Sequence, residues 1–454
     1  MGEFDGQRAV VMGLGRFGGG AGAAAWLASQ GADVLVTDMA NADKLGPALE
    51  SLKPHLDSGA LTLRLGEHNV SDFTGADLVV VNPGVPRPWD NRFVRAARAA
   101  GGRVTTEIGL VVERLPERMR GREHVIGVTG TAGKSTTTAM IECGLRACGA
   151  DVIVGGNIGG SLLGSLDQIG EKTRVVLELS SAMLWWLGGA GGQDGAQTGW
   201  SPGIAVVTSF AANHDDWHGS QEHYQECKRL LLANQREADV AVLGPGVSSW
   251  EIQRGVTRCS PSTVRSSLST PGAHNRLNAG LARAACLSSW GERDTDAMDR
   301  GIAAFPGLPH RCRLVHTSAN GIRFYDDSKC TVPGGVSLAA SGVGEAVGGM
   351  PRVHLIAGGS DKGLDLSPIG RLGPSVGGLY LIGETARSIE AHAGGTATMS
   401  GTLENALGEI HAKAAAGDAV LLSPGCASFG QFVNYEHRGQ EFARLARAVW
   451  ADAD

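Results

Sequence analysis

The sequence has no excess of positive charge, no long apolar run and no leader-like N-terminus. The formal net charge is −6, so no overall basic field attracts nucleic acid or an anionic membrane surface. No apolar run approaches the roughly 20 residues that a membrane-spanning helix needs, and the first residues lack the basic and apolar regions of a signal peptide. We therefore expect a cytoplasmic protein that neither binds nucleic acid nor inserts into a membrane.

The eight cysteines stand singly, without a C-x-x-C pair. This spacing argues against a disulfide framework and against a zinc cluster, and it favours a reducing compartment. A chain of 454 residues is too long for one core, and about 150 residues per domain predict three domains. The expected segments are residues 1–103, 104–309 and 310–454.

The first segment begins with a βαβ unit of the Rossmann type. Strands are expected at Arg8–Met12 and Asp33–Asp38, with the glycine-rich loop G-L-G-R-F-G and a helix between them. Asp38 stands where an acidic side chain meets a ribose in dinucleotide-binding proteins. A third apolar run, residues 76–86, is expected to end at the carboxyl edge of the sheet, where ligands of such sheets bind.

The second segment opens with GVTGTAGKSTTT, residues 127–138. The pattern G-x-x-x-x-G-K-[ST] fails at Val128, but a glycine turn between a strand and a helix still offers backbone N–H groups and a positive dipole end to an anion. Lys134 is expected to reach the outer phosphates of a nucleotide, and Ser135 or Thr136 to hold Mg²⁺. An ordinary strand-to-helix turn is the alternative, although it rarely needs glycine, lysine and two hydroxyls in register.

Two charged residues of this segment stand among apolar neighbours. Glu178 lies in the apolar strand expected over residues 174–180, where a charge is costly unless it is paired or metal-bound, so we expect it to hold Mg²⁺. The alternative is a glutamate that faces solvent. Lys228 lies in the apolar stripe of a helix expected from about Glu222, so its amine is either snorkelling or desolvated. A desolvated amine could react with CO₂ to form a carbamate, a carboxylate-like metal ligand.

Histidines precede this helix. His214 follows a strand, expected over residues 203–210, and is a candidate Mg²⁺ ligand or substrate contact, although a lone histidine is more often structural. The pair His214 and His218 could suggest zinc, but no third ligand stands at motif spacing.

The third segment, after a linker at residues 305–309, again alternates strands and helices. Polar loops at residues 326–331, 358–365 and 423–432 each follow a strand, and such loops form ligand-binding surfaces in parallel sheets. Lys329 and Lys362 would suit anionic groups, against the alternative of solvated loop lysines. Ser428 could simply cap the following helix.

Taken together, the motifs resemble the Mur ligase family over nearly the whole chain. The motifs similar to the family's central domain are T-G-T-A-G-K-S-T at 129–136, G-G-N-I-G at 155–159, E-L-S-S at 178–181, H-x-x-x-H-G-S…Y-x-x-x-K at 214–228 and H-N-x-x-N at 274–278. Four others resemble the member that joins D-glutamate to UDP-N-acetylmuramoyl-L-alanine: G-L-P-H-R at 307–311, D-S-K-x-T at 327–331, G-G-x-D-K-G-x-D at 358–365 and S-P-x-C-A-S-x-x-Q-F at 423–432.

This resemblance implies an α/β fold of three domains. They are a Rossmann-like N-terminal domain, a central P-loop ATPase-like domain with a parallel sheet, and a Rossmann-like C-terminal α/β domain. The implied activity is an ATP-dependent, amide-forming ligase of peptidoglycan synthesis that passes through an acyl phosphate. Its substrates would be ATP, UDP-N-acetylmuramoyl-L-alanine and D-glutamate, its cofactors two Mg²⁺ ions and a carbamylated Lys228, and its state a monomer.

The resemblance also assigns site residues by motif position. The catalytic residues would be Lys134, Lys228, His214 and Glu178. ATP would be bound by Gly130, Thr131, Ala132, Gly133, Lys134, Ser135, Thr136, Asn275, Asn278, Arg311, Asp327 and Lys329. The UDP-linked substrate would be bound by Gly15, Arg16, Phe17, Asp38, Asn82, Gly84, Asn157 and His214. D-Glutamate would be bound by Thr331, Lys362, Ser428, Phe429 and Tyr435. The metal ligands would be Ser135, Glu178, His214 and carbamylated Lys228.

Three departures from the family pattern stand out. Ala132 and Asn213 replace the usual Asn and Asp, and Trp185-Trp186 replaces a milder pair.

Three other functions stay open at this point. An NAD-dependent oxidoreductase would use the first segment but leaves Glu178 and Lys228 unexplained. A P-loop switch would hydrolyse nucleotide without a small amine, and a ligase of the same family could add another amino acid, such as L-glutamate.

Overall fold

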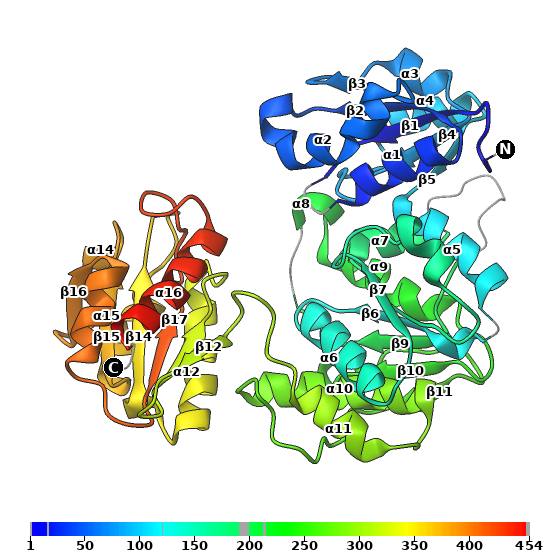
Figure 1. The fold of residues 1–454 in the computed structure, drawn as a ribbon. Coiled ribbons are helices and arrows are strands. Elements are labelled where there is room, and N and C mark those ends of the chain that lie inside the picture. The colour runs from blue at the N-terminus through cyan, green and yellow to red at the C-terminus, as the bar shows by residue number, and fades with distance from the viewer. Residues whose placement is uncertain (1, 16–17, 120, 190–198, 212–214, 451–454) are drawn as a thin grey trace. The chain divides into compact units, whose positions relative to one another are not determined.

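The computed structural model describes residues 2–15, 18–119, 121–189, 199–211 and 215–450. It divides into two compact units. Unit 1 comprises residues 1–263 and 278–302, and unit 2 comprises residues 264–277 and 303–454. In Figure 1 the blue and cyan-to-green sheets belong to unit 1, and the yellow-to-red sheet belongs to unit 2.

The N-terminal sheet of unit 1 has five parallel strands in the order β3-β2-β1-β4-β5. Its strands are β1 (Arg8–Met12), β2 (Asp33–Asp38), β3 (Leu61–Leu65), β4 (Leu78–Val81) and β5 (Arg103–Thr105), and its helices are α1 (Gly19–Ser29), α2 (Ala42–Asp57), α3 (Val70–Thr74) and α4 (Arg92–Ala99). The chain crosses from β3 to β4, so β1 and β4 lie side by side at the switch point of the sheet. Loops that follow these two strands therefore meet at the carboxyl edge.

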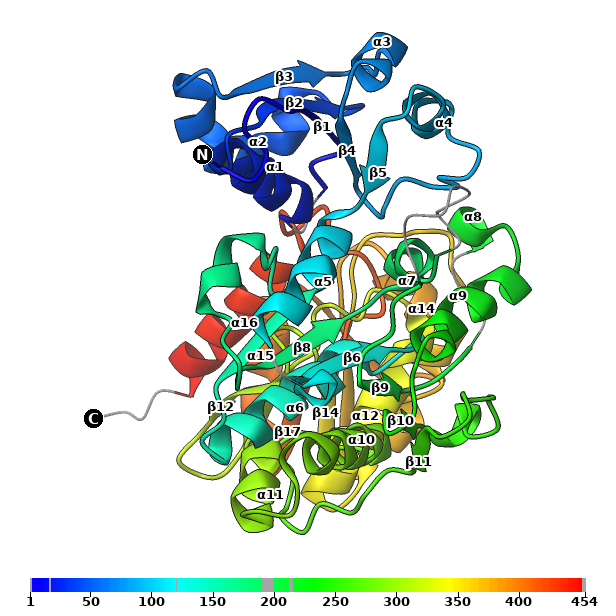
Figure 2. The ribbon, with the colours of Figure 1, turned by 90° about the vertical axis from the view of Figure 1, so that its right-hand side faces the viewer.

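The second sheet of unit 1 has six parallel strands in the order β11-β10-β9-β6-β8-β7. Its strands are β6 (Val125–Thr129), β7 (Val152–Gly156), β8 (Arg174–Glu178), β9 (Ile204–Val207), β10 (Val240–Leu243) and β11 (Thr257–Cys259), and its helices are α5 (Glu107–Arg118), α6 (Lys134–Ala147), α7 (Ser181–Leu187), α8 (Asp215–His218) and α9 (Gln221–Ala233). Two further helices lie mostly in unit 1: α10 (Ala273–Trp290), whose first five residues belong to unit 2, and α11 (Thr295–Ala303), whose last residue does. Strand β6 is buried at every residue and lies between β8 and β9 (Figure 2). This order places the phosphate loop beside the end of β8.

The sheet of unit 2 has six strands in the order β12-β13-β17-β14-β15-β16. Its strands are β12 (Arg313–Thr317), β13 (Arg323–Asp326), β14 (Val353–Gly358), β15 (Gly378–Ile382), β16 (Ala397–Gly401) and β17 (Ala419–Leu422), and its helices are α12 (Pro333–Val347), α13 (Ser367–Gly370), α14 (Ala386–Glu390), α15 (Leu403–His411) and α16 (Tyr435–Val449). Only β12 is antiparallel to its neighbour among these described strands.

Both faces of this sheet are covered. On β14, Leu355 packs in the apolar cluster that includes α12, whereas Ile356 packs in the cluster that includes α15 and α16. Continuous apolar strands are typical of parallel sheets buried on both faces. Three separate sheets, two in unit 1 and one in unit 2, confirm the expected α/β fold class of three domains.

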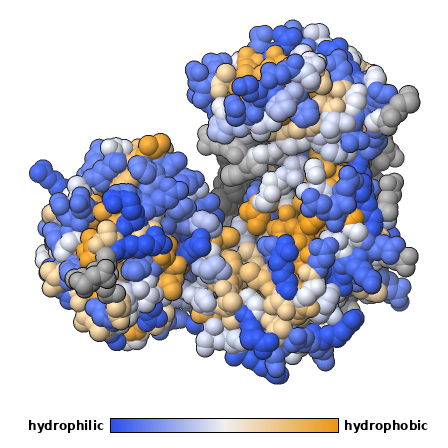
Figure 3. Space-filling model, viewed as in Figure 1, coloured by the Kyte–Doolittle hydropathy of each residue, from blue (hydrophilic) through white to orange (hydrophobic). Residues whose placement is uncertain are grey.

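The described helices are too short or too polar to cross a membrane. In Figure 3 hydrophilic residues cover much of the visible face, and apolar residues gather in smaller areas over the middle of unit 1.

Candidate active site

The phosphate loop connects β6 to α6 through glycines in conformations that other residues rarely adopt. Gly130 has φ +144° and Gly133 has φ +85°. A Cβ atom would overlap the Thr208 hydroxyl at the first position and the Asn278 side-chain oxygen at the second. Glycine is therefore required at both positions, and the N-terminus of α6 follows directly, as an anion-binding loop needs.

The exposed side chain of Ala132 does not hold this loop. Its backbone N–H donates to Ser209 Oγ at 3.0 Å, and its carbonyl oxygen accepts from Thr208 Oγ1 at 2.5 Å and from Ser209 Oγ at 3.1 Å. Hydroxyl groups that follow β9 thus fix the backbone at position 132. This geometry explains how alanine can replace asparagine there without loss of the loop.

Two lysines converge on one carbonyl oxygen of the loop. Lys134 Nζ donates to Gly130 O at 2.8 Å and to Thr131 O at 3.0 Å, and Lys228 Nζ donates to Gly130 O at 2.9 Å. Lys228 is 1% exposed, which rules out the snorkelling alternative. Burial, followed by repulsion from Lys134, lowers the pKa of Lys228 to about 7. The desolvated amine expected from the sequence is therefore present.

Glu178 ends β8 and is 0% exposed, so the solvent-facing alternative is wrong. Its Oε1 accepts a hydrogen bond from Asn157 Nδ2 at 2.9 Å. Its Oε2 is buried without a hydrogen-bond partner among the described residues. A buried carboxylate oxygen in this state is costly unless a cation or solvent completes it, so its chemistry fits a metal ligand.

A cavity of about 650 Å³ in unit 1 gathers five of the residues expected to bind the UDP-linked substrate: Gly15, Asp38, Asn82, Gly84 and Asn157. The Asp38 carboxylate accepts from the backbone N–H groups of Leu14 and Ala40, at 2.9 and 2.8 Å. Asp38 therefore holds the loop after β1. Arg16, Phe17 and His214, which belong to the same expected set, lie outside the described residues.

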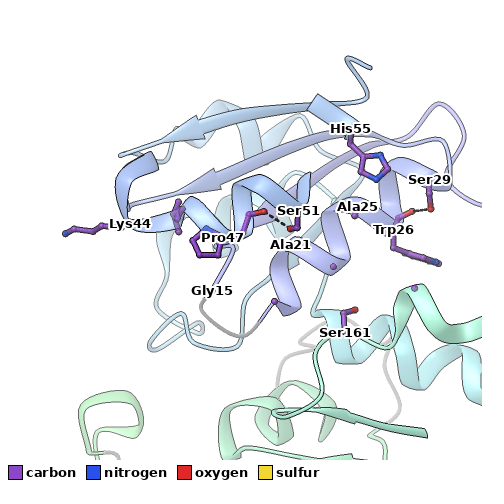
Figure 4. Close-up of a pocket in the computed structure, with 15 residues that line it drawn as sticks. Gly15, Ala21, Ala25, Trp26, Ser29, Lys44, Pro47, Ser51, His55 and Ser161 are labelled. Atoms are coloured by element: carbon purple, nitrogen blue, oxygen red, sulfur yellow. Dashed lines mark hydrogen bonds between the residues drawn. The ribbon is translucent and has the colours of Figure 1, made fainter. Parts of the chain in front are cut away.

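A larger hollow of about 770 Å³ lies against α1 and α2 (Figure 4). Lys44 and His55 are the titratable residues in its lining. We favour the smaller cavity as the substrate site, because it lies at the carboxyl ends of β1 and β4 and contains the amide and carboxylate groups that a polar ligand needs.

The smaller cavity also contains a carboxyl group that the sequence did not single out. Glu107 begins α5, is 6% exposed and accepts from Ser161 Oγ at 2.6 Å. Burial raises the pKa of Glu107 to about 7. A glutamate in the first turn of a helix is ordinary in sequence, so only its burial identifies it as a candidate site residue.

In unit 2 the three polar loops follow β13, β17 and β14, which are neighbours in the sheet. Asp327 accepts from Ser423 Oγ at 2.7 Å and from the Cys312 N–H at 3.1 Å, and burial raises its pKa to about 6. Lys329 Nζ lies 5.3 Å from the centre of the Tyr435 ring. The topology thus brings Asp327, Lys329, Thr331, Lys362 and Ser428 to one edge of the sheet, with Phe429 63% exposed beside them.

Arg438 is a second residue that the sequence did not single out. It is fully buried on α16 and donates hydrogen bonds to the Ser328 hydroxyl and to the carbonyl oxygens of Ser328, Cys426 and Ala427. One guanidinium therefore joins the loop after β13 to the loop after β17. An arginine on an amphipathic helix gives no sequence signal for this role, because its partners are backbone groups.

The other predicted ATP-binding residues divide between the units. Asn278 lies in unit 1 beside the loop, where its Oδ1 is 3.5 Å from Thr137 Oγ1, and Asn275 and Arg311 lie in unit 2. Asn275 Nδ2 donates to Pro271 O at 2.8 Å.

Trp185 and Trp186 are buried in α7. Trp185 contacts the rings of Trp89 and Trp217 at centroid distances of 5.3 and 6.4 Å. The two tryptophans that depart from the family pattern therefore pack in an indole cluster of unit 1, formed by Trp89, Trp185, Trp186 and Trp217.

Known proteins are similar to this chain in sequence. Residues 128–270 match the Mur ligase middle domain, and residues 7–106 match the Mur ligase MurD-like N-terminal domain. The UDP-N-acetylmuramoylalanine--D-glutamate ligase of Roseiflexus sp. strain RS-1 is 34% identical, with 98% of this chain and 99% of the relative covered.

Solved structures share the fold at lower identity. The UDP-N-acetylmuramate-alanine ligase MurC of Thermotoga maritima matches with a TM-score of 0.57 and 16% identity, covering 97% of this chain and 99% of that one. The MurF ligase of the same organism, solved with ADP, matches with a TM-score of 0.53 and 15% identity, covering 99% and 96%.

Proposed function

The chain belongs to the Mur ligase family, and from this premise we propose that it is the ATP-dependent ligase that joins D-glutamate to UDP-N-acetylmuramoyl-L-alanine in peptidoglycan precursor synthesis. The full-length similarity to ligases named for this reaction supports the choice of substrates. The observation that carries the chemistry is that the phosphate loop and the half-partnered carboxylate of Glu178 lie at the ends of adjacent strands, β6 and β8, while Lys228 of α9 donates a hydrogen bond to the loop.

In the proposed reaction the substrate carboxylate attacks the γ-phosphorus of ATP, the bond to ADP breaks, and an acyl phosphate forms. The amine of D-glutamate then attacks the acyl carbon, phosphate leaves, and the amine loses a proton as the amide forms. No side chain acts as a covalent nucleophile. The protein holds the reactants in line and supplies positive charge, chiefly through the backbone N–H groups of the loop and Lys134.

Two Mg²⁺ ions fit the donor groups of this chain. We propose that Ser135 and Glu178 hold one ion, because an orphaned buried carboxylate oxygen faces no hydrogen-bond donor among the described residues. His214 and carbamylated Lys228 are the proposed ligands of the other. When bound, the ions would neutralise charge on the transferring phosphoryl group.

The carbamate proposal rests on the state of Lys228. An amine with its pKa near 7 is neutral in about half of the molecules at neutral pH. The neutral form can attack CO₂, releasing one proton and leaving a carbamate anion. The carbamate on Lys228 would attract the Lys134 cation, whereas a protonated Lys228 repels it. In this proposal Lys134 is the cation that remains at Gly130.

The remaining assignments complete the proposal. The cavity that contains Gly15, Asn82, Gly84 and Asn157 takes the UDP-linked substrate, and Asp38 orients its first loop. Thr331, Lys362, Ser428, Phe429 and Tyr435 take D-glutamate, while Asn275, Asn278, Arg311, Asp327 and Lys329 serve ATP. We propose domain boundaries at residues 103/104 and 309/310, and a monomer that works in the cytoplasm.

Phosphate release from ATP, measured with UDP-N-acetylmuramoyl-L-alanine, tests the proposal. Each reaction receives one of D-glutamate, L-glutamate, L-alanine or diaminopimelate. Release that requires D-glutamate supports the proposal. Release with L-glutamate alone would favour the family ligase for another amino acid, release that ignores every amino acid would favour the nucleotide-hydrolysing switch, and nicotinamide-dependent turnover would favour the oxidoreductase.

A further inference from the structure

Two imidazoles and a thiol converge beside the indole cluster of unit 1. His218 ends α8, and His223 and Cys227 stand four residues apart on α9, so the last two share one face of that helix. One ligand atom from each of the three residues lies within 4.8 Å of the others. The sequence has no third ligand near His214 and His218 at the spacing of a known zinc motif. The fold, however, brings His223 and Cys227 to His218.

The separations fit a tetrahedral ion. His218 Nδ1 and His223 Nδ1 are 3.1 Å apart, and Cys227 Sγ is 4.0 Å from His223 Nδ1 and 3.7 Å from its Nε2. Ligand bonds of about 2.0–2.1 Å for nitrogen and about 2.3 Å for sulfur place neighbouring ligand atoms roughly 3.3–3.6 Å apart around zinc. The third separation, between His218 and Cys227, is within 4.8 Å, so a bound ion would have to draw the ligand atoms together by about 1 Å or less.

The surroundings supply what a metal-binding histidine normally has. The second nitrogen of His218, Nε2, lies 2.9 Å from Ser181 Oγ on α7, so a hydrogen bond fixes the ring while Nδ1 points to His223. His218 is 5% exposed and Cys227 is 0% exposed. Trp217 and Trp89 pack against the imidazoles, at centroid distances of 4.4 Å to His218 and 4.8 Å to His223. Loose, solvated histidines would show none of this order.

The triad also has an entry path. His218 and Trp217 line the 650 Å³ cavity. An ion, and a fourth ligand from solvent, can therefore approach the triad from the cavity at His218. Two nitrogens and one sulfur are the donors that borderline-soft ions such as Zn²⁺ prefer over Mg²⁺, which takes oxygen ligands. The triad shares no residue with the proposed Mg²⁺ ligands, and it contains a thiol and no oxygen donor.

We propose that His218, His223 and Cys227 form a binding site for a zinc-class divalent cation, with a fourth coordination position open toward the cavity. On binding, the thiol of Cys227 loses its proton to solvent and forms a sulfur–metal bond, while each histidine binds through a neutral nitrogen. Occupancy would tie the end of α8 to α9. The site stands on geometry alone and does not depend on the ligase activity.

Cobalt(II) titration of the chelator-treated full chain tests this site. We expect a near-ultraviolet thiolate-to-cobalt charge-transfer band and tetrahedral visible bands that saturate at one ion per chain, and that one equivalent of Zn²⁺ abolishes. Cys227→Ser should remove the charge-transfer band, and His223→Gln should weaken cobalt affinity at least about tenfold. Cys259→Ser, which changes a partly buried thiol on β11, should leave the spectrum unchanged.

Two outcomes would overturn the proposal: no charge-transfer band in the parent chain, or a band that persists in Cys227→Ser. Because Cys227 is buried, a second variant is needed in case Cys227→Ser does not fold. His223→Gln serves this purpose, because His223 is only partly buried. A parent-like visible spectrum and affinity in folded His223→Gln, judged by circular dichroism, would likewise exclude this ligand set.

Discussion

Lys134 and Lys228 donate hydrogen bonds to the same carbonyl oxygen, that of Gly130, at 2.8 and 2.9 Å. Burial first, and repulsion from the Lys134 cation second, lowers the pKa of the buried Lys228 to about 7. The arrangement keeps Lys228 available as a neutral amine while Lys134 remains at the loop.

Lys228→Ala should therefore lose nearly all ligase activity, because the variant cannot form the proposed carbamate. Short carboxylates such as acetate or formate should restore part of it by occupying the vacated space with a negative charge. Phosphate release with and without added carboxylate measures both effects. Lys172→Ala, which removes an exposed lysine, is the control. Full activity of Lys228→Ala without rescue would contradict the carbamate role.

Glu178→Gln should reduce kcat/KM by about 100-fold or more, because the neutral amide is a poor metal ligand of nearly the same shape. Its stability should not fall, since the change removes a buried charge that is only partly satisfied. Activity as a function of Mg²⁺ concentration and thermal unfolding measure the two effects. Glu171→Gln should behave as the parent chain in both. A variant that unfolds easily but keeps its activity would argue for a structural carboxylate.

Arg438→Lys should destabilise unit 2 by about 3 kcal/mol, because lysine cannot replace the hydrogen bonds to three backbone carbonyls. The KM for D-glutamate should rise, since both loops that this arginine joins belong to the proposed amino-acid site. Urea unfolding and steady-state kinetics measure these changes. Arg444→Lys, on the exposed side of α16, should change neither. An unchanged KM in a destabilised variant would leave Arg438 with a purely structural role.

Glu107 predicts a pH dependence of stability. Its folded pKa of about 7 lies above the ordinary glutamate value of 4.5, so between these pH values the folded chain keeps a proton that the unfolded chain loses. Its contribution is therefore most favourable below pH 4.5 and declines as the pH rises toward 7, by up to about 3 kcal/mol.

Urea unfolding at pH 5 and pH 8 checks this sign. Glu107→Gln should gain stability relative to the parent at pH 8 and should show a smaller difference between the two pH values. Glu50→Gln, at an exposed position of α2, should keep the parent's dependence. If the parent and Glu107→Gln responded equally to pH, Glu107 would not be the titrating group.

The sequence predicted the central strands well because they are buried on both faces. Strands β1 and β2 have the expected bounds, β8 and β9 lie within the expected runs, and β6 is the strand expected before the glycine turn. The strands that it missed include all six sheet edges: β3, β5, β7, β11, β12 and β16. Most edge strands are partly exposed, so their apolar pattern is broken; in β12, for example, no residue is buried. The central strand β10 was also missed, and its four residues give only a short signal.

The sequence indicated several candidate site residues, but it could not show which of them lie in contact. A loop motif and a lysine in an apolar stripe identify Lys134 and Lys228, but their shared acceptor depends on β6 and α9 meeting in space. Glu107 and Arg438 gave no signal, because their roles come from burial and from backbone partners.

Isotope transfer tests the central claim most directly. The UDP-N-acetylmuramoyl-L-alanine carboxylate is labelled with ¹⁸O, and the phosphate released in the presence of ATP and D-glutamate is examined by mass spectrometry. Attack of the carboxylate on the γ-phosphorus predicts one labelled oxygen in each phosphate released with product. Phosphate without label, formed at the same rate as the amide, would contradict the acyl-phosphate account.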